Sequence, residues 1–519
     1  MCSLLAIIVY IVNTSASSAK AESRQPNIII VGGGVAGFVL ANRLSEDPHI
    51  KVILLEAGPD PTGDPEVSTP AFAGLLESTQ YTTNLISTPQ TSLNGTVIVT
   101  QQGHALGGGS AVNYMQYCRG SPSVYDEWSE RSNDASWSWE GMQEYFRRST
   151  KLALPNVSYA PAVNPNVYGH GPVTISFEKD VDILAPKWIQ LFKQADGLSQ
   201  VDPNAGNGIF ATYMTHTVLP VNATRETSLT TYGYPVAGRP NLTVLKGVLV
   251  TKINFVGTHA TSVTCIDINN HNSTRTISLA SQGEVIITAG AINTPKLLML
   301  SGVGPHAQLA KLNITTIVDL PIGQKLLNHM GAVISLNVTA AQWSASQLSN
   351  ATYYVSALHN YSASASGILA QPAVAAAAAG RVPTGISSWH DSLPADRPHV
   401  LYQPANAPTL LGNYTQGTNV VSLIVFLVSP ESHGTVRLAS ADPFAQPIFD
   451  PNTFGTEGDR KVLLWAYKHA RALLKHESVA DVVLGEIFPG DGVQTDEQIW
   501  LAIEKGVFDF GHPVGTVGQ

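Results

Sequence analysis

The sequence predicts an α/β protein in which a domain built on a parallel sheet is joined to a second domain built on an antiparallel sheet. The chain has 519 residues, more than a single hydrophobic core usually serves. A β-branched run at 27–31 is followed by three glycines and by an Ala/Val/Leu-rich segment that ends near Leu44. This order of strand, glycine turn and helix opens a parallel, nucleotide-binding type of sheet. Between 331 and 450 the pattern changes to strands and loops of low charge, which we assign to the second domain.

Later segments predict that the chain returns to the first domain twice. Strand-like runs at 241–255 and 284–288 indicate the first return, and helical spacing of apolar residues at 459–475 indicates the second. The Ala-rich stretch 373–380 is compatible with a helix or with a loop. We therefore expect a nucleotide-binding domain formed by 27–180, 235–330 and 459–519, and a substrate domain formed by 181–234 and 331–458.

The charge of the chain argues against a nucleic-acid partner. Charged residues make up 13% of the sequence and the formal net charge is −9, so that clustered Lys and Arg are scarce. A small, neutral or weakly polar substrate fits this composition better. No group of side chains has the spacing of metal ligands, and we predict no metal.

The N-terminal segment 1–21 predicts a secretory signal peptide, because an apolar run is followed by small residues. The run is about half the roughly 20 residues of a membrane span, so we expect no stable membrane anchor. Asn-x-Ser/Thr sequences support a secreted or secretory-pathway glycoprotein. They occur at Asn94, Asn156, Asn222, Asn241, Asn272, Asn313, Asn337, Asn350, Asn360 and Asn413.

Beyond Cys2, the chain has Cys118 and Cys265, which is no disulfide framework.

The first chemical motif is Gly32-x-Gly34-x-x-Gly37, with Glu56 at the end of the following strand. The glycines allow a tight turn and a close approach of the backbone to a pyrophosphate, and the helix that follows offers amide donors. Glu56 would accept a hydrogen bond from a ribose hydroxyl. The predicted dinucleotide contacts also include the adjoining residues Val35, Ala36 and Ala57. The motif alone does not separate FAD from NAD.

Two longer motifs resemble the signatures of the glucose–methanol–choline oxidoreductases. The run Gly103-His-Ala-Leu-Gly-Gly-Gly-Ser-Ala-Val-Asn113 resembles the first signature and departs from it at His104, and residues 290–304 resemble the second. The resemblance implies that the dinucleotide is FAD. It also implies cofactor contacts from Leu106, Gly108, Ser110, Asn113, Val250 and Ala289.

The resemblance also bears on how the flavin is held. Some members of this family attach it to a histidine at or beside the position of Asn113, where this chain has Val112-Asn113. We therefore predict noncovalent FAD. His104 lies outside that position and is a less favoured tether.

The motif Phe510-Gly-His-Pro-Val-Gly-Thr516 is similar to the family's HPxGT segment. The resemblance implies that His512 takes the hydroxyl proton of an alcohol while a hydride leaves the carbon for N5 of the flavin. An imidazole suits this task because its ordinary pKa of about 6.5 leaves a base available near neutral pH. We interpret His170, His329 and His433 as structural.

The resemblance implies that a family member continues past the HPxGT segment. That tail carries a second His or Asn, which completes the catalytic pair. This chain ends at Gln519. We therefore expect that the sequence is truncated at its C-terminus, with an incomplete catalytic pair, or that the protein is a defective relative.

The leading interpretation is an FAD-dependent alcohol oxidase or dehydrogenase, whose flavin is reoxidised by oxygen or a quinone. The run 107–120 is closest to fungal members that act on aryl alcohols or in secondary metabolism. A non-redox lyase or cyclase on the same scaffold and an inactive FAD-binding remnant remain alternatives.

Overall fold

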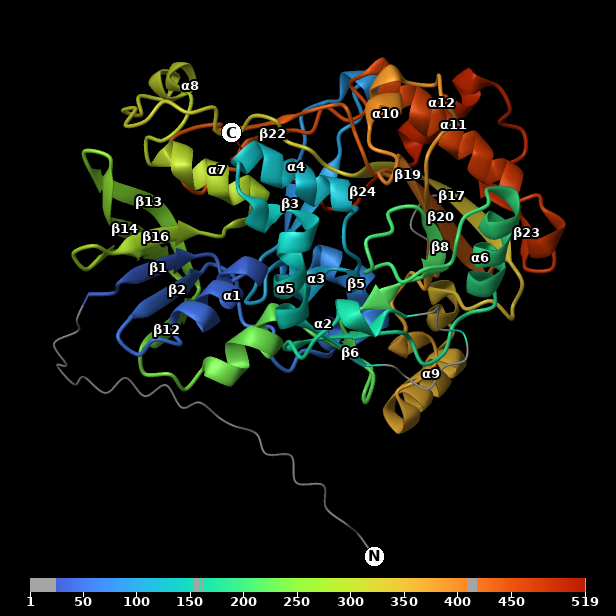
Figure 1. Cartoon of the computed structure of the whole chain (residues 1–519), viewed down its shortest axis with the longest axis horizontal. Helices are drawn as coiled ribbons and strands as arrows, with labels where there is room; N and C mark the ends of the chain where they lie inside the picture. Colours follow the sequence, from blue (N-terminus) through green and yellow to red (C-terminus); the bar gives the residue numbers. More distant parts are fainter. Residues whose placement is uncertain (1–24, 154–158, 160–162, 408–417, 519) are drawn as a thin grey trace, which may run out of the picture.

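The computed structural model describes residues 25–153, 159, 163–407 and 418–518. The segment 1–21 and the sites Asn156 and Asn413 lie outside the described residues, so the signal peptide stays a prediction. The predicted fold class is confirmed. Figure 1 shows a parallel sheet with its helix on one side of the molecule and a larger antiparallel sheet on the other.

The parallel sheet has four strands in the order β12-β2-β1-β16, and every neighbouring pair is parallel. One face packs against α1, where Phe38 and Ala41 meet Ile30 and Leu54. The other face packs against the antiparallel sheet β13-β14-β15. Because both faces are covered, β1 is an uninterrupted apolar run, which is typical of a buried parallel strand. The carboxyl ends of β1 and β2 carry the glycine turn and Glu56 to the same edge.

The larger sheet follows the order β23-β17-β20-β19-β18-β8, and β24 also pairs with β17. All of these pairs are antiparallel. The Ala-rich stretch, which the sequence left open between helix and loop, forms the strand β18, which lies between β19 and the edge strand β8. Its alanines are buried, and their small side chains leave room for α6 to pack closely on the sheet.

The C-terminal helices cover the large sheet. Val462 and Leu463 of α11 and Ile503 of α12 belong to the same core as β17 and β20, and the Tyr467 hydroxyl donates to the carbonyl of Val333 at 3.0 Å. This packing differs from the expectation that residues 459–519 return to the nucleotide-binding domain. The reason is that the apolar face of α11 matches the sheet surface, and a helical pattern does not specify its partner.

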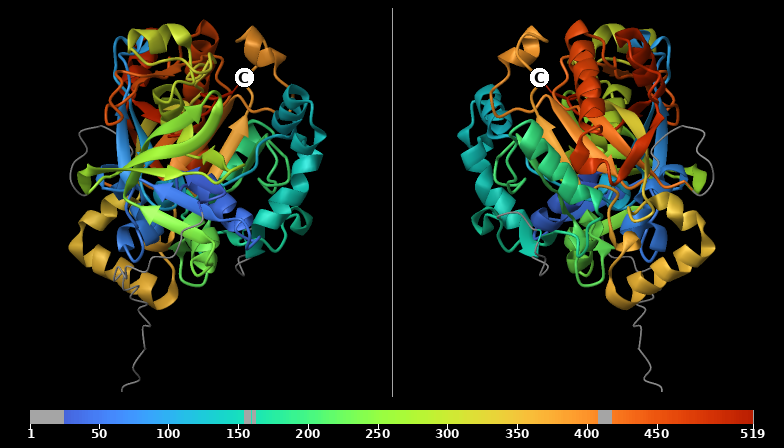
Figure 2. Two further views of the ribbon diagram at one scale, coloured as in Figure 1. Left: turned by 90° about the vertical axis from the view of Figure 1, so that its left-hand side faces the viewer. Right: turned by 90° about the vertical axis from the view of Figure 1, so that its right-hand side faces the viewer.

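The remaining elements complete the two halves. Figure 2 shows the helices of residues 122–149 on one flank and the helix of residues 351–364 at the opposite lower edge. The helices are α1 (Val35–Leu44), α2 (Pro65–Ser68), α3 (Gly109–Val112), α4 (Pro122–Ser132), α5 (Trp139–Ser149), α6 (Leu184–Ala195), α7 (Gly290–Leu300), α8 (His306–Lys311), α9 (Ala351–Ser364), α10 (Ser388–Ser392), α11 (Glu457–Leu473) and α12 (Asp496–Lys505).

The strands are β1 (Ile28–Val31), β2 (Val52–Glu56), β3 (Thr82–Ile86), β4 (Val99–Gly103), β5 (Gln116–Tyr117), β6 (Thr150–Ala153), β7 (Val173–Ser176), β8 (Phe210–Tyr213), β9 (Thr215–His216), β10 (Val218–Leu219), β11 (Thr224–Arg225), β12 (Leu242–Lys246), β13 (Val248–Val256), β14 (His259–Asp267), β15 (Asn270–Ser278), β16 (Glu284–Ile287), β17 (Met330–Val338), β18 (Ala376–Gly380), β19 (Val400–Ala405), β20 (Val420–Leu427), β21 (Thr435–Arg437), β22 (Ile448–Asp450), β23 (Val483–Phe488) and β24 (Val507–Asp509).

Several sequence features have a clear structural setting. Asn94 and Asn222 are exposed, but the amide nitrogen of Asn241 donates to three backbone carbonyls at 2.9–3.1 Å and is therefore a poor glycan acceptor. Cys118 and Cys265 are both free. Within the described residues, no helix has the length and apolar character needed to cross a membrane, and no group of His, Cys, Asp and Glu side chains could hold a metal ion.

Candidate active site

A cavity of about 3240 Å³ extends between the parallel sheet and the large sheet. It is several times larger than a usual small-molecule site, so it has room for a long cofactor as well as a substrate. Its wall brings together eleven of the predicted site residues, whose roles stay predictions. They are Gly32, Gly34, Val35, Ala36, Glu56, Ala57, Gly108, Asn113, Val250, Ala289 and His512.

Gly37, Leu106 and Ser110 do not line this cavity but support its wall. A Cβ atom at Gly37 would lie 2.0 Å from the carbonyl oxygen of Gly32, so the glycine lets α1 pack against the turn. Leu106 is buried in the core beneath α1. The Ser110 hydroxyl donates to the Gly107 carbonyl at 2.6 Å and accepts from the Ser228 amide at 3.0 Å.

Glycines shape the end of the cavity next to the parallel sheet. Gly108 has a φ of +53°, and a Cβ there would lie 2.6 Å from the Cα of Gly34. The two glycine-rich loops therefore touch through bare backbone. No side chain caps the N-terminus of α1, which begins at Val35 on the cavity wall, so its amides and its dipole are available to an anion.

Glu56 lies beside this turn with both carboxylate oxygens engaged. They accept hydrogen bonds from the amides of Gly33 at 2.6 Å and Gly58 at 2.7 Å. Burial raises the pKa of the carboxyl group, and the backbone donors act in the opposite direction. Each oxygen keeps a further lone pair, so the group can still accept from a hydroxyl.

The segment that ends at Asn113 is anchored from behind by Arg225. This buried guanidinium donates to the carbonyl of Asn113 at 2.5 Å and to its side-chain oxygen at 2.8 Å. It also donates to the carbonyl of Val67 at 2.7 Å. Arg225 is not predictable as a site residue from the sequence, because an isolated Arg carries no local signal of burial.

His512 is held at the other end of the cavity by the pairing of β24 with β17, in which Met330 lies opposite Asp509. The chain continues beside β17, and the amides and carbonyls of Leu327 and Val514 exchange hydrogen bonds at 3.0 and 2.9 Å. The Thr516 hydroxyl donates to the carbonyl of Ala291 at 2.6 Å, at the start of α7. The predicted catalytic motif is thus tied to both sides of the cavity.

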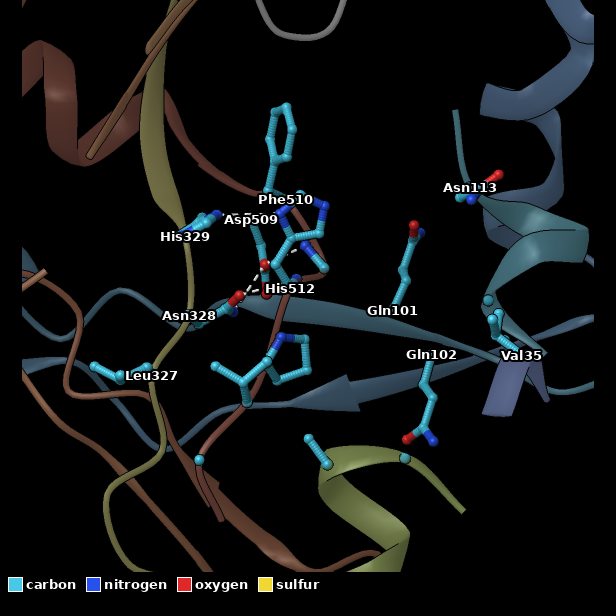
Figure 3. Close-up of a pocket in the computed structure, with 18 of the residues that line it drawn as sticks. Val35, Gln101, Gln102, Asn113, Leu327, Asn328, His329, Asp509, Phe510 and His512 are labelled. Carbon is cyan, nitrogen blue, oxygen red and sulfur yellow. Dashed lines mark hydrogen bonds between the residues drawn. The ribbon is translucent and has the colours of Figure 1, made fainter. Parts of the chain in front are cut away.

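A polar network surrounds the backbone of His512 (Figure 3). Asn328 accepts from the His512 amide at 3.0 Å and donates to Asp509 at 2.9 Å. Asp509 also accepts from the Gly511 amide at 2.7 Å and from the Thr100 hydroxyl. With these donors in place, the buried carboxylate is satisfied and fixes the turn that presents His512.

The imidazole of His512 faces that of His329, with 3.2 Å between their Nδ1 atoms. Both rings line the cavity, where His512 is exposed and His329 is half-buried. Burial lowers the pKa of His512 to about 4, and burial together with the neighbouring ring lowers the pKa of His329 to about 3. Both rings are therefore neutral near pH 7. From the sequence we interpreted His329 as structural, since nothing in its local sequence relates it to His512.

The wall fits a dinucleotide followed by a substrate. A pyrophosphate can bind to the bare backbone of the glycine turn and the uncapped N-terminus of α1, and a ribose can bind to Glu56. The neutral imidazole of His512 lies at the far end of the cavity. FAD has the length and the groups for this arrangement.

The fold, the site and the comparisons together define a flavin-dependent oxidoreductase. A family model described as GMC oxidoreductase matches residues 27–331, and its C-terminal counterpart matches residues 430–518. The chain belongs to the glucose–methanol–choline oxidoreductase family, whose members use FAD.

Individual relatives agree with this assignment. A glucose-methanol-choline family oxidoreductase of Annulohypoxylon moriforme is 32% identical over 96% of this chain and 85% of its own. An alcohol dehydrogenase [acceptor] of Pseudomonas putida is 31% identical over 94% of this chain and 85% of its own. An FAD-dependent oxidoreductase structure from Chaetomium thermophilum has a TM-score of 0.84 and 26% identity, with 95% of this chain and 89% of that chain covered.

The comparisons do not support the expected C-terminal truncation, because the two family models together span most of the chain.

We expect Gly37→Ala to abolish or strongly weaken FAD binding, because the added methyl group collides with the Gly32 carbonyl and displaces α1 from the turn. Flavin absorbance per polypeptide measures the effect. Gly238→Ala is the control, since its methyl group would have nothing within 4 Å. Normal flavin content in Gly37→Ala would contradict the role of this close contact.

Proposed function

We propose that the protein oxidises an alcohol to a carbonyl compound, with His512 as the base. The observation that carries the proposal is a neutral imidazole on the wall of the cofactor-sized cavity. Figure 3 shows His512 across the cavity from Asn113, with Gln101 between them in this view. An alcohol bound beside His512 would have its hydroxyl within reach of an unprotonated ring nitrogen.

His512 would remove the hydroxyl proton, and the carbonyl double bond would form as the hydride leaves the same carbon. FAD, when bound, supplies the acceptor for that hydride. Asn328 and Asp509 hold the backbone of His512, so the base needs little reorganisation during the reaction. Oxygen or a quinone would then accept the electrons.

The nature of the cavity wall supports a weakly polar alcohol. Near His512 the wall includes the side chains of Phe426, Phe508, Phe510, Leu401 and Ile424. One relative is named an alcohol dehydrogenase, which supports the CH–OH donor class. The non-redox alternative predicts turnover without flavin reduction, and no observation of this structure favours it.

We expect His512→Ala to slow anaerobic reduction of the flavin by an alcohol by about 10²–10⁴-fold, the usual contribution of a general base. The absorbance of oxidised flavin, followed by stopped flow with a panel of primary and secondary alcohols, measures this rate.

The control for that experiment is His359→Ala, on the exposed face of α9. It should reduce at the parent rate. An unchanged rate in His512→Ala would rule out the assigned base, and product formation without flavin bleaching would rule out alcohol oxidation.

The pH dependence should follow the lowered pKa of His512. We expect the reduction rate to be constant from about pH 8 to about pH 6, and to fall only as the pH approaches about 4, where the ring becomes protonated. The titratable side chains around it are His329, which is also neutral, and Asp509, whose pKa is raised by burial against the opposing effect of its three donors. A loss of activity centred near the ordinary histidine value of about 6.5 would contradict this setting.

We also propose that FAD is held without a covalent bond. The side-chain oxygen of Asn113 is engaged by Arg225, and an amide is not a nucleophile that attaches to flavin. After acid precipitation, all flavin absorbance should appear in the supernatant. Flavin that stays with the polypeptide in the parent but is released in His104→Ala would instead identify His104, which also lines the cavity, as the tether.

A further inference from the structure

The contact between the rings of His329 and His512 constrains the protons of both. Two Nδ1 atoms 3.2 Å apart form a hydrogen bond only if one of them carries hydrogen and the other presents a lone pair. Both rings are neutral near pH 7, so each has one N–H. The direction of the bond therefore decides which nitrogen of His512 is free to act as a base.

A second contact decides the direction. The backbone carbonyl of Val428 lies beside the His329 ring and raises its pKa, as an acceptor does for a ring N–H. The Nδ1 atom of His329 faces His512, so Nε2 is the nitrogen that reaches Val428 and must carry the hydrogen. A neutral imidazole has one N–H, which leaves Nδ1 of His329 as an acceptor. His512 must then donate from its own Nδ1.

We propose that His329 is a positioning residue that holds His512 in the tautomer with hydrogen on Nδ1 and a bare Nε2 facing the substrate. The hydrogen bonds run from His512 to His329 and on to the Val428 carbonyl. This inference rests on the proposed role of His512 as the base and deepens it.

The backbone ensures that the two rings meet. His329 immediately precedes β17, and its carbonyl accepts from the Phe510 amide at 3.2 Å, while Asn328 accepts from the His512 amide at 3.0 Å. The ring centroids lie 5.3 Å apart at an interplanar angle of 74°. The two Nδ1 atoms are much closer than the centroids, so the rings meet at these two nitrogen-bearing edges, with their planes turned and not stacked.

The roles of the neighbouring groups are distinct. Asn328 and Asp509 bond to backbone amides and to each other, so they fix the position of the His512 backbone but not the tautomer of its ring. Phe510 packs against the His512 ring at 4.9 Å and offers no acceptor. Within the described residues, His329 is the partner found for Nδ1 of His512.

The first test is the tautomer itself, observed in the FAD-loaded enzyme without substrate. Histidine side chains labelled with ¹⁵N distinguish a protonated from a bare ring nitrogen, and loss of signals in His512→Ala assigns the ring. We expect hydrogen on Nδ1 and none on Nε2 of His512 near neutral pH. Hydrogen on Nε2 in the parent enzyme would overturn the proposal without any variant of His329.

The second test compares His329→Leu with His329→Asp. Leucine fills the position but cannot accept a hydrogen bond, whereas a carboxylate can only accept. We expect the leucine variant to lose the single tautomer and to reduce flavin about 10-fold to 100-fold more slowly, within the range of a general-base contribution. The aspartate variant should keep hydrogen on Nδ1 and recover most of the rate.

The outcomes separate this proposal from the proposed function. Two outcomes would show that His329 only packs against His512 and does not set its tautomer. One is an unchanged His512 tautomer in His329→Leu, and the other is equal reduction rates in the leucine and aspartate variants at equal flavin content. An unchanged reduction rate in His512→Ala would refute the base assignment, while the ¹⁵N spectrum of the parent would still test the tautomer.

Discussion

The site depends on the pairing of residues 507–516 with residues 323–332. Met330 lies opposite Asp509 in this pairing, and the bonds between Leu327 and Val514 extend it. The same segment ends at Thr516, whose carbonyl accepts from Gly323 and whose hydroxyl reaches Ala291. Because it contacts the edge of the large sheet and the first turn of α7, this segment fixes the position of His512 relative to the glycine-rich wall.

At the opposite end, the cavity exists because its wall is formed by glycines, which have no side chains to fill it. Gly108 and Gly34 approach through bare backbone, and Gly37 lets α1 meet the turn after β1. Glycine loses more conformational freedom on folding than other residues, so such a wall is costly and is used where the backbone itself must contact a ligand. The uncapped start of α1 is consistent with that use.

Burial gives the two histidines their chemical character. It lowers the pKa values of both rings, so both are neutral. Between their Nδ1 atoms there is then one hydrogen bond, in which one ring donates and the other accepts. Asp509 is also buried, but its donors come from Gly511, Asn328 and Thr100, and it stays part of the scaffold. Such networks define one geometry when every member is satisfied. The proposed role of His512 as a base thus depends on the assembled network as well as on the residue itself.

The sequence by itself determined the family and the fold class and predicted residues that line both ends of the cavity, since glycine turns, strand patterns and the HPVGT motif express local backbone preferences. Tertiary structure decided that Ala376–Gly380 is a buried strand of the large sheet, that α11 covers this sheet, and that Gly37, Leu106 and Ser110 support the cavity from behind. It also brought His329 to His512 across 183 residues. Pairing between distant segments depends on complementary surfaces and strand register, which no local pattern contains.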